Sequence, residues 1–283
     1  MRCPVVLVTG ASSGFGLLTS IALAKQGFYV LAGIRDLSKK GELQEKAAAE
    51  GVENNIEYLL LDVTKESDIA QAAEIVENQF GYLDVLINNA GIAVPDFAEC
   101  LSVGDYRKQF ETNVFGVIQM TQAFLPLIRR SKQGRIINVS SISGLAGFPG
   151  LSAYTASKHA VEGFSESLFF EVKPFGIDVI LIEPGSFATK IWEKSLSFLK
   201  NNHPQSGYYQ ALKERLLSRF MNNAPGMADP GIVVKVLTHA VTVRKPKFRY
   251  IIGKNSRLML IIKRLFPWKI WAALVFKEIE KNR

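Results

Sequence analysis

Short apolar runs alternate with helix-patterned segments along most of the chain, and this alternation leaves few folds open. Strands that are apolar on both faces belong to parallel sheets covered by helices on both sides. The expected strands are Val5–Val8, Phe28–Ile34, Ile56–Leu61, Leu83–Ile87, Arg135–Val139, Ile177–Ile182 and Tyr250–Ile252. The expected helices are Gly14–Gln26, Lys39–Glu50, Glu66–Phe80, Val103–Arg130, Ser152–Val172 and Pro230–Val243. The pattern predicts an α/β protein with one doubly wound parallel sheet in a single domain over residues 1–253.

Composition and charge exclude several classes of protein. The chain has 283 residues, 48% of them hydrophobic and 21% charged, which is typical of a globular protein and not of a disordered one. Two cysteines exclude a disulfide scaffold, and three histidines without ligand spacing give no reason to expect a metal site. Residues 244–283 hold 12 Lys and Arg against 2 Glu, whereas residues 1–243 hold 22 against 24 Asp and Glu. Because the body is near neutral, nucleic acid is not expected as a partner.

The turn between the first strand and the first helix is rich in glycine. Glycines permit a tight turn and a close approach of the backbone to a pyrophosphate, while the helix N-terminus offers unpaired N–H groups. The spacing Gly-x3-Gly-x-Gly differs from the common Gly-x-Gly-x2-Gly, and a glycine-rich turn without a ligand is the alternative. The candidate dinucleotide-binding residues here are Thr9, Gly10, Ser12, Ser13, Gly14, Phe15 and Gly16.

Two residues on one expected helix have the chemistry of an acid–base pair. Tyr154 and Lys158 stand at positions i and i+4 and therefore share a helix face. A phenol has a pKa of about 10, and a nearby ammonium lowers it by stabilising the phenolate. Such a tyrosine can donate a proton in carbonyl reduction or accept one in alcohol oxidation. Taken alone, the same pair is more typical of a solvated helix face.

Further motifs follow in a fixed order along the chain. They are Asn88-Asn89-Ala90-Gly91 after the fourth strand, Asn113, Ser141, Tyr154-Thr155-Ala156-Ser157-Lys158, and Pro184-Gly185 after the sixth strand. Together with Thr-Gly-x3-Gly-x-Gly they resemble the short-chain dehydrogenase/reductase superfamily over about residues 3–253, in particular its hydroxysteroid and retinol dehydrogenase-like members. The resemblance implies a Rossmann-type fold and hydride transfer between a nicotinamide cofactor and a carbon that carries oxygen.

The resemblance also implies individual roles. Tyr154 would move the proton, Ser141 would orient the substrate oxygen, Lys158 would tune Tyr154 and bind the nicotinamide ribose, and Asn113 would hold a water that links the lysine to solvent. Ser141 lies thirteen positions before Tyr154, as the family serine does; Ser140 and Ser143 are the alternatives. The remaining expected cofactor contacts are Asp62 and Val63 at the adenine, Asn89, Ala90 and Gly91 along the cleft, and Pro184, Gly185 and Thr189 on the nicotinamide side.

The residues after the second strand bear on the choice of cofactor. A protein that binds NAD commonly has a carboxylate here that accepts from the ribose 2′-hydroxyl. Arg35 instead offers several donors to a 2′-phosphate, and Ser13 adds a hydroxyl. We therefore predict NADP(H), with NAD(H) as the alternative if Asp36 reaches the ribose. The other interpretation of Asp36 is a cap for the helix that starts near Ser38.

Residues 186–229 interrupt the alternation of strands and helices and are rich in aromatic side chains. A long excursion in a compact domain is more often functional than structural. We expect this segment to form a substrate cover, and apolar pockets with few polar groups suit lipophilic ligands. Candidate substrate contacts are Phe148, Phe187 and Trp192, beside Ser141 and Tyr154. The alternative is that these aromatic residues form a small helical core.

Residues 254–283 form a basic, amphipathic tail. Leu258, Ile261, Ile262 and Leu265 follow helical spacing after Ser256, a candidate N-cap, and Pro267 suits the first turn of a second helix. Trp268, Trp271, Ala272 and Val275 share one face of that second helix. Such helices either lie on an anionic membrane surface or pack on the domain with their lysines in water. Charges interrupt the apolar run, so we do not expect a transmembrane helix.

The sequence thus predicts an NADP(H)-dependent oxidoreductase that acts on a lipophilic alcohol or ketone of a steroid-, retinoid- or lipid-like kind. One alternative is a 3-oxoacyl thioester reductase of lipid synthesis, although related members are usually shorter and lack a basic tail. A non-catalytic nucleotide sensor on the same fold would have lost the tyrosine, lysine or serine, and all three are present. The resemblance implies a homodimer or homotetramer. Without a visible secretory signal we expect a cytoplasmic protein, with peripheral membrane association through the tail.

Overall fold

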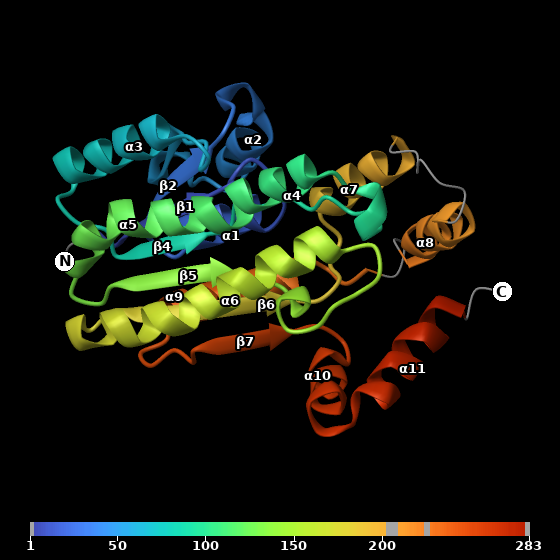
Figure 1. The fold of residues 1–283 in the computed structure, drawn as a ribbon. Coiled ribbons are helices and arrows are strands. Elements are labelled where there is room, and N and C mark those ends of the chain that lie inside the picture. The colour runs from blue at the N-terminus through green and yellow to red at the C-terminus, as the bar shows by residue number, and fades with distance from the viewer. Residues whose placement is uncertain (1–2, 202–208, 224–226, 281–283) are drawn as a thin grey trace.

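The computed structural model describes residues 3–201, 209–223 and 227–280 and contains one parallel sheet (Figure 1). Its seven strands lie in the order β3-β2-β1-β4-β5-β6-β7. They are β1 Val5–Thr9, β2 Tyr29–Ile34, β3 Ile56–Leu60, β4 Val85–Asn88, β5 Arg135–Val139, β6 Asp178–Pro184 and β7 Arg249–Ile252. All six strand pairs are parallel. The expected Rossmann-like α/β fold is confirmed, and every expected strand is present within two residues of its expected ends.

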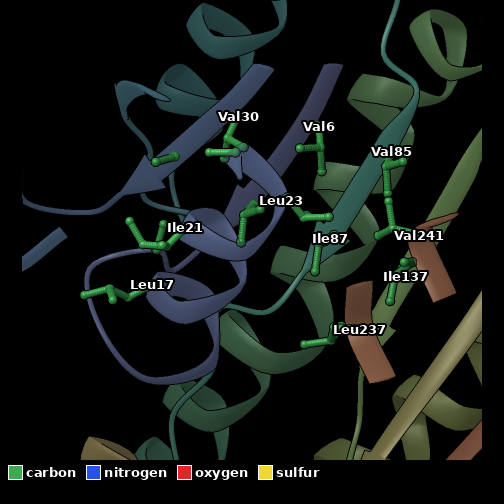
Figure 2. Packing of buried hydrophobic residues seen from close by; sticks show 14 of the residues in the cluster. Val6, Leu17, Ile21, Leu23, Val30, Val85, Ile87, Ile137, Leu237 and Val241 are labelled. Carbon is green, nitrogen blue, oxygen red and sulfur yellow. The ribbon is translucent and has the colours of Figure 1, made fainter. Parts of the chain in front are cut away.

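Helices cover both faces of the sheet. One face packs against α1 Gly14–Ala24, α2 Gly41–Ala49 and α9 Gly231–Thr242. The other packs against α3 Glu66–Gln79, α5 Gly116–Arg129 and α6 Ser152–Val172. Along β1 the side chains alternate between the two cores, Val6 and Val8 on one side and Val5 and Leu7 on the other. Figure 2 shows the first core, where Leu17, Ile21 and Leu23 of α1 meet the strands.

The long helix expected over Val103–Arg130 is divided into three parts. It begins as α4, Val103–Phe110, widens to a π-helical turn at Glu111–Phe115, and continues as α5. In a π turn the backbone hydrogen bonds span one more residue than in an α-helix, so the 3.6-residue spacing is interrupted. The hydrophobic pattern alone does not predict this interruption. The turn carries Asn113, whose fully buried side chain bonds to the backbone of another loop.

The segment after β6 and the tail are both helical. Residues 186–229 contain α7, Lys190–Asn201, and α8, Gln210–Asn223, while residues 202–208 and 224–226 lie outside the described part. The tail contains α10, Ser256–Leu265, and α11, Trp268–Glu280. Ser256 is not the N-cap that we expected: it is the first helical residue and is buried, and Asn255 with φ +59° precedes it. No helix in the described part of the chain has the length and the apolar character to cross a bilayer.

The order of the strands determines where a ligand can bind. From β1 the chain crosses to β2 and β3 in one direction, and β4 to β7 extend the sheet in the other. The carboxyl ends of β1 and β4 therefore lie side by side with the connections leaving in opposite directions, which is where open α/β sheets form a crevice. The glycine-rich turn and the Asn89-Ala90-Gly91 loop both start at this point.

At the amino ends of the strands, opposite the crevice, a buried arginine holds the end of α9. Arg135 is 3% exposed and lies in β5. Its Nη1 donates to the carbonyl oxygen of Ala240 at 2.7 Å and also to that of Val241, and its Nη2 donates to that of Val243 at 2.6 Å. The guanidinium thus binds carbonyl groups that a helix leaves without partners at its C-terminus.

We predict that Arg135→Met lowers the free energy of unfolding by about 3 kcal/mol, because several buried carbonyls lose charged donors. The measurement is urea denaturation followed by circular dichroism. The control is Arg130→Met: Arg130 pairs with Glu77 at the surface, and both side chains are more than half exposed, so its loss costs about 1 kcal/mol at most. Equal stability of the two variants would contradict the prediction.

Candidate active site

A cleft of about 270 Å³ opens at the carboxyl ends of the strands and collects most of the predicted site residues. Its walls include these expected residues: Gly10, Ser12, Ser13, Gly14, Phe15, Arg35, Asp62, Val63, Asn89, Ala90, Gly91, Ser141, Tyr154, Lys158, Pro184, Gly185, Phe187, Thr189 and Trp192. Four expected residues, Thr9, Gly16, Asn113 and Phe148, are not in the walls. The walls also contain residues that we did not predict, among them Ile92, Ala93 and Ile191.

Two glycines of the first turn, Gly10 and Gly16, occupy positions where a side chain would not fit. Gly10 has φ +68°, and a Cβ built on it would lie 2.9 Å from the Cα of Ala90. A Cβ on Gly16 would lie 2.5 Å from both Asn89 Nδ2 and the Gly10 carbonyl oxygen. Gly16 therefore lies on the side of the turn that faces away from the cleft, where it lets α1 approach the Asn89 loop closely. This position explains why Gly16 does not line the cleft.

Thr9 and Asn89 join the two loops at the floor of the cleft. Thr9 Oγ1 accepts hydrogen bonds from the backbone N–H groups of Asn89 at 3.0 Å and Ala90 at 2.9 Å. In return Asn89 Nδ2 donates to the carbonyl oxygen of Thr9 at 2.8 Å. Thr9 is 1% exposed. It holds the loop after β4 in place, so its expected direct contact with a cofactor has no counterpart in the lining of the cleft.

The groups near the N-terminus of α1 suit a dinucleotide. The first turn of α1 carries no acidic residue, and Ser13 precedes the helix without using its side chain as a cap. The helix therefore offers N–H groups and the positive end of its dipole to an anion. Gly14 lies across from Thr189, whose Cβ would be 3.7 Å from a Cβ on Gly14. The positive φ of Gly14, +58°, and the acid-free helix end fit a pyrophosphate.

The structure separates Arg35 from Asp36. Arg35 is exposed and lines the cleft. Asp36 does not line it, because its carboxylate accepts hydrogen bonds from Ser38 N at 3.1 Å and Ser38 Oγ at 2.7 Å. These bonds lower the pKa of Asp36. Of the two interpretations of Asp36, the capping one is what the structure has, although the capped element is a short 3₁₀ turn, Leu37–Lys39, ahead of α2.

Tyr154, Lys158 and Ser141 converge in the cleft. Lys158 Nζ lies 5.8 Å from the centre of the Tyr154 ring and donates to the carbonyl oxygen of Val139 at 2.8 Å. Burial lowers the pKa of Lys158 to about 8. Ser141 hydrogen-bonds to Tyr154 and also accepts from the backbone N–H of Ser143 at 3.1 Å.

The pKa of Tyr154 moves opposite to the direction that we expected from its lysine neighbour. Burial raises the pKa of this phenol, and the hydrogen bond with Ser141 lowers it by less. The physical reason is that Tyr154 is almost completely buried and loses hydration of its phenolate, while the ammonium of Lys158 is bound to Val139. In the cleft as it stands, Tyr154 is therefore a protonated donor.

The two alternative serines differ in position. Ser140 lines the cleft beside Ser141, whereas Ser143 is buried and does not line it. Ser140 Oγ is buried and has no hydrogen-bond partner among the described residues. Because Ser141 alone of the three interacts with the Tyr154 hydroxyl, its expected place beside the tyrosine agrees with the geometry.

Asn113 fixes a loop of the cleft from behind. Its Oδ1 accepts from the backbone N–H of Ile92 at 2.9 Å, and its Nδ2 donates to the carbonyl oxygen of Ile92 at 3.0 Å and to Ser157 Oγ at 3.2 Å. It is fully buried. These bonds use its amide to hold the loop that follows Gly91, and its expected water-mediated link to Lys158 stays a prediction.

Sequence reasoning missed a buried cluster of charges behind the lysine. Arg249 of β7 bonds to Glu162 and Glu166 of α6 and to Glu183 of β6. Glu183 is fully buried, and this burial raises its pKa to about 7. Glu162 stands four residues after Lys158, and its charge raises the pKa of that lysine against the effect of burial. Two features of the sequence could have indicated this cluster. Glu183 lies inside an otherwise apolar strand, and Glu162 lies on the same helix face as Tyr154 and Lys158.

The substrate side is formed in part as expected. Trp192 lines the cleft, but Phe187 is 1% exposed and packs edge-on against Phe15 at 6.1 Å between ring centres. Phe187 is thus mainly a residue of the core between the sheet and α1, α2 and α9, which is neither the expected substrate contact nor part of a separate helical core. Phe148 lies outside the lining and packs against Trp271 of α11 at 6.5 Å, because the tail covers it. Its expected contact with substrate is therefore not supported.

The helices α7 and α8 are attached to the loop after β4 by polar contacts. Ser195 Oγ donates to the carbonyl oxygen of Ala93 at 3.2 Å. Lys213 Nζ of α8 bonds to Asp96 at 2.9 Å, and both side chains are almost completely buried. These contacts place residues 190–201 over the side of the cleft that contains Ile92, Ala93 and Trp192.

Comparisons with known proteins agree with this geometry. A family model described as short chain dehydrogenase matches residues 4–199. The chain is 46% identical over 281 residues to the uncharacterized oxidoreductase YusZ of Bacillus subtilis, covering 99% of each protein. It is 33% identical over 271 residues to retinol dehydrogenase 8 of Bos taurus, covering 93% of this chain and 85% of that protein. A short-chain dehydrogenase from Streptomyces avermitilis has the same fold, with a TM-score of 0.78, 30% identity, and coverage of 100% of this chain and 98% of that one.

The matched family and the cleft point to the same chemistry. The family model spans the glycine-rich turn, the Asn89 loop and the helix that carries Tyr154 and Lys158, and it ends within α7. The resemblance inferred from the sequence motifs is confirmed. The chain belongs to the short-chain dehydrogenase/reductase family and is an NAD(P)-dependent oxidoreductase of the class that acts on CH–OH and C=O groups.

Proposed function

We propose that the protein uses NADP(H) to interconvert a lipophilic alcohol and its ketone or aldehyde. The observation that carries the proposal is one cleft with Arg35 at the end beyond β2 and Tyr154, Ser141 and Lys158 at the other. A dinucleotide bound along the acid-free N-terminus of α1 connects these two ends. The substrate then lies between the tyrosine and the apolar wall of Ile92, Ala93 and Trp192.

Each residue of the reacting end has a distinct task in this proposal. When bound, the nicotinamide gives or takes the hydride. Tyr154, protonated in its buried site, donates a proton to the carbonyl oxygen during reduction, and in the reverse direction its phenolate form takes a proton from the alcohol. Ser141 holds that oxygen next to the phenol. Lys158, with its pKa near 8, holds a positive charge close to the tyrosine at neutral pH and stabilises the phenolate as it forms.

An apolar wall supports a lipophilic substrate. Aliphatic and aromatic side chains of Ile92, Ala93, Ile191 and Trp192 line the cleft beside the catalytic groups. Apolar walls with a few convergent polar groups favour ligands that bury hydrocarbon and present one oxygen. The relative named retinol dehydrogenase 8 carries in its name a substrate of this chemistry.

Cofactor choice can be tested by titrating the protein with NADPH and NADH, followed by energy transfer from tryptophan. We predict tighter binding of NADPH, and we predict that Arg35→Gln weakens it by about thirtyfold while NADH binding is unchanged, because a charged hydrogen bond contributes about 2 kcal/mol. The matched control is Asp36→Asn, which removes the neighbouring charge and leaves both affinities unchanged. If Asp36→Asn weakens NADH selectively, the ribose contact belongs to Asp36 and the proposal of NADP(H) is wrong.

Turnover tests the assigned roles and the substrate class. We predict that Tyr154→Phe keeps its affinity for NADPH and loses at least about a hundredfold in kcat, because it lacks only the transferred proton. The assay follows NADPH oxidation with propanone, with long-chain methyl ketones and with a 3-oxobutanoyl thioester. We expect kcat/KM to rise with chain length among the ketones. Normal turnover in Tyr154→Phe would refute the mechanism, and a preference for the thioester would favour the alternative of a 3-oxoacyl thioester reductase.

The buried carboxylate of Glu162 gives a prediction on pH dependence. The ammonium form of Lys158 is present below its pKa of about 8, so ketone reduction should decline as the pH rises through this value. Removing the charge of Glu162 destabilises that ammonium and lowers its pKa. In Glu162→Gln the alkaline decline of kcat/KM should therefore begin at lower pH than in the wild type. The control is Glu166→Gln, which also contacts Arg249 but is more than half exposed; a decline at the same pH in all three proteins would contradict this role.

A further inference from the structure

The first tail helix leaves its apolar stripe in solvent. Leu258, Ile261 and Leu265 are 57%, 52% and 72% exposed and lie at positions i, i+3 and i+7 of α10, on one face. Phe266 directly follows α10 and Trp268 begins α11, and these two side chains are 49% and 70% exposed. We call these five residues the tail patch. A group of exposed apolar side chains on a protein surface often marks an interaction site.

The opposite side of the tail is docked on the domain, and this fixes the direction in which the tail patch points. Ser256 at the start of α10 is buried, and Lys263 Nζ donates to the carbonyl oxygen of Leu145. In α11, Trp271 is 4% exposed and packs against Phe148. Trp268, which the sequence placed on the same face as Trp271, stays in solvent. The tail thus packs some of its apolar residues on the domain and leaves others in solvent.

Cations surround the tail patch. Arg257 and Arg264 flank the stripe of α10, and Lys269 follows Trp268; all three are exposed. Among the described side chains, none of these three forms an ion pair. Residues 244–283 hold 12 Lys and Arg against 2 Glu. The partner of the tail patch must therefore be both apolar and negatively charged.

We propose that the tail patch docks on an anionic lipid surface, with α10 lying in the plane of the interface. An exposed apolar stripe, aromatic residues at its end and flanking cations are the features by which a helix inserts shallowly among headgroups. Each cation near such a surface adds attraction. A second copy of the chain is the poorer occupant, because a two-fold contact through the tail patch would bring its cations against their own equivalents.

The position of α10 gives the docking a consequence for catalysis. A Cβ built on Gly185, in the wall of the cleft, would lie 3.0 Å from Ser256 Oγ at the start of α10. The tail also contacts Leu145 and Phe148 in the segment that follows Ser141. A docked tail therefore holds the catalytic cleft next to the bilayer. If the proposed lipophilic substrate is correct, such a substrate reaches the cleft from the lipid phase without crossing bulk water.

The test is sedimentation of the full-length protein with vesicles of phosphatidylcholine mixed with phosphatidylserine, and with vesicles of phosphatidylcholine alone. We expect binding to the mixed vesicles that weakens at high salt. Leu265→Ser and Arg264→Glu should each reduce the vesicle affinity at least about fivefold, since each removes an apolar anchor or a cation. The controls are Val103→Ser, which replaces a side chain that is 66% exposed on α4, and Lys132→Glu, which makes the same change of net charge away from the tail.

The outcomes separate this proposal from the proposed function. Vesicle binding does not require turnover or a particular cofactor, and circular dichroism with thermal unfolding of each variant shows that its fold is intact. Absence of binding to the mixed vesicles, or equal losses in tail and control variants, would overturn the proposal. A dimer in gel filtration that Leu265→Ser dissociates, without vesicle binding by the wild type, would assign the tail patch to a second copy instead.

Discussion

Hydrogen bonds between Thr9 and Asn89 join the carboxyl ends of β1 and β4, and the rest of the site depends on this junction. The connections after β1 and β4 leave in opposite directions there, so the two loops start side by side and need a bond between them to keep their relative position. The Thr9 hydroxyl accepts from two backbone N–H groups of the second loop, and Asn89 returns a bond to the first. Because Gly10 and Gly16 have no side chains, the first turn and α1 can pack directly against the Asn89 loop. The surface that a cofactor binds is therefore already formed in the folded protein.

The parts that the sequence predicted well are those specified by neighbours along the chain. Most residues of each strand are apolar, and Tyr154 and Lys158 share a helix face through simple i, i+4 spacing. The π turn at Asn113 is different, because the side chain that it carries bonds to Ile92, a residue in a distant loop that offers both a donor and an acceptor. No local pattern shows that such a partner exists. The same holds for Phe148, whose exposure to substrate was removed by Trp271 from the far end of the chain.

The cluster of Arg249 with three glutamates is a buried charged group that no sequence motif predicts, because its members come from distant parts of the chain. Glu183 stands in β6 and Arg249 in the neighbouring edge strand, while Glu162 comes from the catalytic helix. Their sequence positions are unrelated, and only the order of the strands brings them together. Burial makes each charge depend on the others. The catalytic lysine is thus supported from behind by an acid that ties its helix to the edge of the sheet.

The two walls of the cleft are attached to the molecule in different ways. The cofactor wall consists of strand ends and the first turn of α1, whose backbone is continuous with the buried cores on both faces of the sheet. The helices α7 and α8 are held mainly on the loop after β4. Ser195 bonds to Ala93, Lys213 pairs with Asp96, Phe198 packs with Val94 and Leu101, and Tyr209 stacks on Phe97. The first wall belongs to the central cores and opens only with them, whereas α7 and α8 lie outside the sheet and can open as a local unit at a lower free energy. Amide hydrogens in α8 should therefore exchange with solvent through brief local openings, while those of β1 and β4 exchange only when the whole domain unfolds.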